Sequence, residues 1–167
     1  MVAAVRARPE IEAASAREAV MARVTTGHPV VAAGPHAPPA TRLHAPPATR
    51  SLQLFVADDL ETRQVTVVRR LSGAWPPPPG TMLLERTALA VMGAGEGDTL
   101  TVTTPHGQPQ AIAISGVVHD TALAPAWQEH RGYGYITRDT LAALGEPARA
   151  ARSVRAVCAC TGDPGRR

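Results

Sequence analysis

The residues with the greatest capacity for chemistry lie between 116 and 137, in the stretch GVVHDTALAPAWQEHRGYGYIT. His119 is followed directly by Asp120, and His130 comes shortly after them. Imidazole and carboxylate groups are common metal ligands, and a bound divalent metal can lower the pKa of a water molecule enough to make it a nucleophile. One hypothesis is therefore a small metal-dependent hydrolase that uses these three residues.

The same stretch also fits a purely structural role. Asp120 can cap the turn after a strand through its side-chain oxygen, which leaves His119 as a partly buried, hydrogen-bonded histidine. Trp127 would cover the core, and Tyr133 and Tyr135 would lie on a strand whose alternating glycines let another backbone come close. Because a metal centre needs more ligands than this stretch supplies, we favour the structural role and expect no metal, no cofactor and no catalytic residue.

No other motif in the sequence is a stronger candidate for a catalytic or binding site. The chain has no G-x-S-x-G nucleophile motif, and the glycine-rich stretch 93–97 lacks the lysine of a phosphate-binding loop, so we expect no ATP binding. Cys158 and Cys160 are two apart, too close for an unstrained disulfide and too few for a zinc site. We therefore predict that the chain is not an enzyme.

Composition points to a globular domain with no nucleic-acid partner. The 167 residues are 44% hydrophobic and 19% charged, but only 3% aromatic, so aliphatic side chains must fill the core. Arginine supplies all the basic side chains other than histidine, and the formal net charge is +3. The arginines are scattered along the sequence, without the interleaved aromatic residues that stack on bases. No run of about 18 apolar residues exists that would span a bilayer.

The local patterns predict an α+β fold in which short helices link mixed or antiparallel strands. Gly93 should end one helix as its C-terminal cap, Thr137 should begin another as its N-cap, and the prolines of SGAWPPPPG form a rigid elbow with Trp75 as its anchor. A further helix ends near residue 8, and Val65 to Leu71 suggests an extended piece. The expected strands are 18–26, 52–56, 81–85, 99–104, 110–118, 132–137 and 153–159, and the expected helices are 86–93 and 137–145.

A proline-rich duplication interrupts this pattern at 35–50. The sequence HAPPATR occurs at 36–42 and again at 44–50, and its prolines disfavour both helix and strand, so we interpret it as an extended or disordered insertion. Its alternatives are a metal site using His36 and His44, or a docking peptide, which would make the chain a soluble proline-rich interaction protein.

Several motifs, taken in order, resemble one known family. The chain is similar to the extracytoplasmic domain of FtsX-like ABC transporter permeases, called the MacB-like periplasmic core domain, over roughly residues 1–157. The stretches that carry the resemblance are GAWPPPPGTMLLERTAL, GEGDTLTV, GVVHD with PAW, and GYGYITRDTLAALG. The motif residues within them are Trp75, Pro76, Glu85, Arg86, Gly97, Asp98, His119, Asp120, Trp127, Tyr133 and Tyr135.

The resemblance implies a non-catalytic domain of two small lobes that sits on the extracytoplasmic face of the cell membrane. It would lie between the first and second transmembrane helices of a permease and couple ATPase-driven motion to substrate or partner handling. Its partners would be the rest of the permease, its ABC ATPase subunit and an extracytoplasmic protein. Because the chain carries no transmembrane helix, we expect a fragment of such a permease, with residues 158–167 as a divergent or disordered tail.

Overall fold

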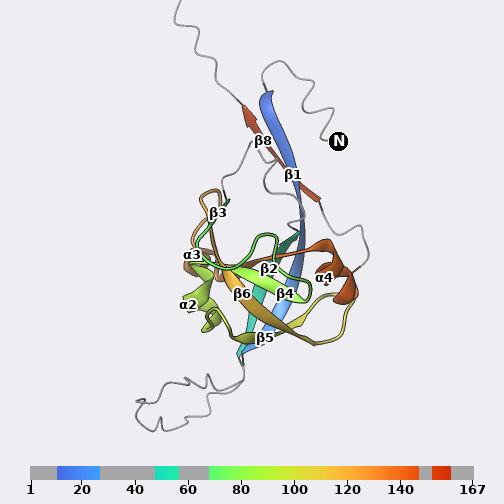
Figure 1. Ribbon diagram of the computed structural model, residues 1–167. Coiled ribbons are helices and arrows are strands. Elements are labelled where there is room, and N and C mark those ends of the chain that lie inside the picture. Colours follow the sequence, from blue (N-terminus) through green and yellow to red (C-terminus); the bar gives the residue numbers. More distant parts are fainter. Residues whose placement is uncertain (1–10, 27–47, 57–67, 147–151, 159–167) are drawn as a thin grey trace, which may run out of the picture.

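Six strands close a mixed β-barrel in the computed structural model, which describes residues 11–26, 48–56, 68–146 and 152–158. Neighbours around the barrel follow the order β1, β2, β7, β4, β6, β5 and back to β1 (Figure 1). The strands are β1 (Ile11–Thr26), β2 (Ala48–Val56), β4 (Thr81–Glu85), β5 (Thr99–Thr103), β6 (Gln110–Asp120) and β7 (Arg131–Ile136).

Two of the pairings in the barrel are parallel and the others are antiparallel. Strand β2 runs parallel to β7, and β4 runs parallel to β6. In each pair, other strands and helices separate the two partners in the sequence. The hairpin of β5 and β6 pairs antiparallel, as the turn residues between them predict. A short strand, β3 (Val68–Arg70), adds to the carboxyl end of β6.

The N-terminal half of β1 extends beyond the barrel and pairs with the last strand, β8 (Arg152–Cys158). The two strands are antiparallel, so Ile11 lies opposite Cys158 at the far end and Glu18 lies opposite Arg152 near the barrel. Figure 1 shows this ribbon projecting away from one side of the barrel. The two ends of the described fold therefore leave the barrel together.

Among the described residues, three short helices lie on the surface of the barrel, and local signals explain the end of one and the start of another. Helix α2 (Ala88–Met92) ends at Gly93, which adopts the left-handed conformation with φ 64°. Helix α4 (Arg138–Ala143) begins after Thr137, whose side chain accepts a hydrogen bond from the backbone N–H of Thr140 at 3.3 Å. Helix α3 (Ala126–Glu129) lies beside α2, on the side of the barrel away from α4 (Figure 1).

Aliphatic side chains fill the barrel, and a small aromatic group lies on the opposite face of β2 and β7 from Leu52 and Leu54. Along β6 every second residue from Ile112 to Asp120 is buried, although a bulge between Ile114 and Gly116 in the pairing with β4 interrupts the alternation of faces. The ring of Tyr135 lies 5.4 Å from that of Phe55, and Phe55 in turn stacks on Tyr133 at 6.3 Å. The largest fully buried side chains are those of Leu52, Leu54, Met82, Leu83, Leu84, Met92, Ile114, Tyr135, Ile136, Leu141, Leu144 and Val24.

The predicted fold class is confirmed in its coarse form, as mixed strands with short helices. Each predicted strand overlaps an observed one, although β1 begins at Ile11 rather than at residue 18. The described residues make one barrel, and no second lobe is seen among them. Helix α3 was not predicted. The predicted helix ending near residue 8 lies outside the described residues, and so does the predicted tail 158–167 except for Cys158, which belongs to β8.

The prediction that the proline-rich duplication is an insertion is wrong for its last three residues. Residues 48–50 belong to β2, where Ala48 pairs with Thr26 and Arg50 pairs with Val24. The second HAPPATR copy therefore finishes inside the barrel sheet, because no proline remains after Pro47 to block the ladder. The rest of the duplication lies outside the described residues.

Candidate functional site

Glu85 and His119 meet at the carboxyl ends of the parallel strands β4 and β6. The Oε1 atom of Glu85 lies 3.3 Å from Nδ1 of His119, whose side chain is 25% exposed, whereas that of Glu85 is only 3% exposed. The other carboxylate oxygen accepts hydrogen bonds from the backbone N–H of Thr87 at 2.7 Å and from the Thr87 hydroxyl. All of this carboxylate's contacts come from the chain itself, as a buried charge requires.

Thr87 connects this carboxylate to both helices on the same side of the barrel. Thr87 is the N-cap residue of α2, and its hydroxyl oxygen accepts the backbone N–H of Ala126, at the start of α3, at 3.0 Å. The buried Glu85 therefore holds the strand-to-helix step after β4 and, through one hydroxyl group, the start of α3. These contacts give Glu85 a role in positioning the starts of α2 and α3.

Asp120, the last residue of β6, makes the second buried polar centre. One carboxylate oxygen accepts the Tyr135 hydroxyl at 2.5 Å, and the other accepts the backbone N–H of Ala122 at 2.9 Å. Asp120 is 1% exposed and Tyr135 is fully buried. The predicted turn cap at Asp120 is confirmed, and so is the prediction that His119 is partly buried and hydrogen-bonded.

The Trp75 elbow packs against this centre. The Trp75 ring contacts that of Tyr135 edge to face at 6.1 Å, so its predicted role as an anchor is confirmed, and the peptide bond between Trp75 and Pro76 is cis. The chain before the elbow lies directly on β6: a Cβ added to Gly116 would come within 2.5 Å of the Ser72 carbonyl oxygen. Glycine is needed there because two backbones touch.

Gly132 and Gly134, which flank Tyr133, were expected to let another backbone come close, but they make room for side chains instead. A Cβ on Gly132 would lie 2.7 Å from the Met92 side chain, and one on Gly134 would lie 3.0 Å from that of Leu54. The close neighbours are thus core side chains rather than another backbone, so that part of the prediction is wrong. The missing side chains make room for α2 and β2 to pack on β7.

The remaining motif residues lie in turns at the edge of the barrel. The backbone N–H of Gly97, which has φ 90°, donates to the Ile114 carbonyl at 2.8 Å, and the Asp98 carboxylate accepts the Gly95 N–H at 2.7 Å. Arg86 has an exposed side chain, but its backbone N–H donates to Val118 at 2.9 Å. These contacts explain the residues as hairpin and strand-end geometry.

His130 does not join His119 and Asp120. His119 and Asp120 are consecutive on β6, so their side chains point to opposite faces of the strand, and His130 caps the C-terminal end of α3. Among the described residues, no three His, Cys, Asp or Glu side chains are grouped so that they could hold a metal ion. The structure therefore offers no support for the hydrolase hypothesis.

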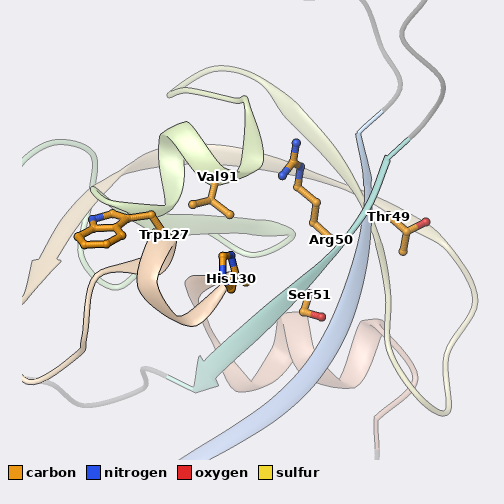
Figure 2. Close-up of a pocket in the computed structure, with 6 residues that line it drawn as sticks. All are labelled: Thr49, Arg50, Ser51, Val91, Trp127 and His130. Carbon is orange, nitrogen blue, oxygen red and sulfur yellow. The ribbon is translucent and has the colours of Figure 1, made fainter.

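Residues 127–130, at the end of α3, instead face solvent. Trp127 is 64% exposed, so the prediction that it covers the core is wrong. It lines an open pocket of about 500 Å³ between β2, α2 and α3 (Figure 2). The residues that line this pocket are Thr49, Arg50, Ser51, Val91, Trp127 and His130.

Sequence reasoning missed this pocket because its residues come from three separate segments. Arg50 belongs to the duplication that was taken for an insertion, and Val91 lies in a helix with an ordinary apolar pattern. The only local signal was the sequence PAWQEH, in which a tryptophan and a histidine occupy a short helix with no buried stripe for either of them.

A polar pair lies at the opposite end of the barrel, next to α4. The Glu146 carboxylate accepts the His106 backbone N–H at 3.1 Å and lies 3.0 Å from the His106 ring nitrogen Nδ1. Burial alone would raise the pKa of the Glu146 carboxyl, but hydrogen bonds from His106 and Thr104 and the charge of His106 outweigh it. The net effect is a pKa below the ordinary value of a glutamate.

Comparisons with known proteins add no relative. No protein-family model matches this chain, and no curated protein matches it. In the part of the chain that the structure describes, we find no helix long and apolar enough to cross a lipid bilayer.

Proposed function

We propose that this chain is part of the extracytoplasmic domain of an FtsX-like or MacB-like ABC transporter permease. Its work is mechanical: it couples ATPase-driven motion of the permease to the handling of a substrate or a protein partner outside the membrane. The proposal rests on the ordered motif residues and on one structural observation, the ribbon formed by β1 and β8.

This ribbon supports the proposal because it brings both ends of the barrel domain to one place. Ile11 lies opposite Cys158 at its far end, and the barrel lies entirely to one side of this pair. A domain inserted between two membrane helices needs this arrangement, since both connections must return to the same lipid surface. We further propose that the domain has two lobes, and that the ribbon of β1 and β8 is the base of the second lobe.

The motif residues support a coupling role in a second way. Tyr135 contacts both Trp75 and Asp120, and Glu85 is joined through Thr87 to the starts of α2 and α3, so these residues tie loops and helices to strands. A closed barrel with its loops fixed in this manner moves as a unit. That property suits a domain that passes on a motion generated elsewhere.

Antibodies raised against this chain test the proposal in the native cells. The expected result is a protein larger than 17.4 kDa that stays with the membrane after an alkaline wash and is cut by protease added to intact spheroplasts. An ABC ATPase should co-purify with it from mild detergent. A 17.4 kDa protein that stays in the soluble fraction and is cut only after lysis would contradict the proposal.

A further inference from the structure

We propose that the pocket between β2, α2 and α3 binds a small organic anion with an apolar body. Arg50 and His130 would hold its acidic group, and Trp127 and Val91 would contact its apolar part. This inference does not depend on the transporter assignment, because it rests on the lining of the pocket alone.

Neither basic side chain of the pocket, the Arg50 guanidinium or the His130 imidazole, forms an ion pair within the described part of the chain. Both residues are exposed. The nearest acid in sequence, Glu129, lies 3.2 Å from Arg131 and is thereby engaged. A guanidinium group and an imidazole N–H that line the same pocket offer donors that suit a carboxylate, sulfonate or phosphate.

The apolar side of the pocket also leaves a large hydrophobic side chain exposed. Trp127 is one of three large hydrophobic side chains that are exposed among the described residues, together with Met21 and Leu71. Of these it alone lines the pocket, with Val91 opposite on α2. Aromatic rings at such positions contribute flat apolar contact area to ligands.

The backbone fixes the position of these groups. Strand alternation places Arg50 on the opposite face of β2 from Thr49 and Ser51, and Figure 2 shows the Arg50 side chain extending towards α2. His130 has φ 53°, a left-handed conformation that few residues other than glycine adopt, and it ends α3 there. The pocket volume of about 500 Å³ falls in the range of small-molecule sites.

A matched pair of fluorescent probes tests this proposal. The first is 8-anilinonaphthalene-1-sulfonate, and the second is N-phenyl-1-naphthylamine, which has the same aromatic frame without the acidic group. The folded protein is expected to bind the sulfonate at least about tenfold more tightly than the neutral amine, because charge-assisted hydrogen bonds are available only to the anion. Equal affinity for the two probes would overturn the proposal.

Substitutions then place the probe in the pocket. Arg50→Gln and Trp127→Ala should each lower the affinity for the sulfonate about tenfold, whereas the controls Arg69→Gln on β3 and Leu71→Ala should leave it unchanged. The indole N–H resonance of Trp127 should shift on titration while that of Trp75 stays in place. Unchanged affinity in Arg50→Gln, or a shift at Trp75 alone, would contradict the site.

Discussion

The stretch from residue 116 to 137 divides between two regions that use the same kinds of side chain in opposite ways. At the carboxyl end of β6, His119 and Asp120 are held by Glu85 and Tyr135, and the carboxylates are almost wholly buried. Around α3, Trp127 and His130 face solvent with Arg50 near them.

The difference between the regions lies in whether the chain satisfies its own polar groups. Where each donor and acceptor is paired within the fold, burial makes the pairing costly to break and the residues serve architecture. Where a guanidinium group, an imidazole ring and an indole ring are exposed without such partners among the described residues, they are available to a ligand. Residue type alone does not separate the two cases, because histidine and aromatic residues occur in both.

The largest expected effect comes from the buried centre at Asp120. Asp120→Ala removes two hydrogen bonds and leaves the buried Tyr135 hydroxyl without this acceptor, so the free energy of unfolding should fall by about 3 kcal/mol. The matched control is Asp98→Ala, which loses one turn hydrogen bond and should cost about 1 kcal/mol. Urea unfolding measures both, and equal losses would remove the distinction between a buried centre and an ordinary turn.

The close approach of the elbow to β6 gives the next largest effect. Gly116→Ala places a methyl group against the Ser72 carbonyl and the Gly73 backbone, neither of which is a flexible side chain, and should cost about 2 kcal/mol. Gly95→Ala is the control, since its new methyl group would meet only the Asp98 carboxylate at 3.9 Å. Thermal unfolding should show a clear drop in Tm for the first variant and little change for the second.

A smaller effect is expected from the Glu146 and His106 pair. Because the pKa of Glu146 is lowered in the folded protein, its contribution to stability is present above the ordinary glutamate pKa and is lost as pH falls through the folded value. Glu146→Gln should therefore flatten the loss of stability between neutral and acidic pH. Urea unfolding at a series of pH values measures this, and an unchanged acid limb in the variant would contradict it.

The smallest effect on stability should come from the exposed pocket. Trp127→Ala removes a side chain that is 64% exposed, so the free energy of unfolding should change by no more than about 0.5 kcal/mol. Trp75→Ala, which deletes the ring packed on Tyr135, is the matched comparison and should cost about 3 kcal/mol. If the two variants lost equal stability, Trp127 would have to be regarded as part of the core.

The sequence predicted most of the elements because their signals are local. The cap at Gly93, the N-cap at Thr137 and the alternation of Ile112 and Ile114 each need only a few neighbouring residues. The turn cap at Asp120 was predictable for the same reason.

Barrel closure was not predictable in this way. It depends on the pairing of β1 with both β2 and β5 and on two parallel pairings, all between segments that are distant in the sequence. The errors at Trp127 and at residues 48–50 have the same origin, because the partner of each lies elsewhere in the chain. The residues of a short apolar or proline-flanked motif do not determine which distant segment it pairs with or packs against.

The central proposal, that the chain is part of a permease, is tested most directly by the genomic DNA on both sides of its coding sequence. Translation of those flanks in all three frames is predicted to give an apolar stretch of about 20 residues on each side, with an ABC ATPase gene adjacent. Flanks that hold only complete, unrelated genes would contradict the claim, while leaving the anion pocket to stand or fall on its own test.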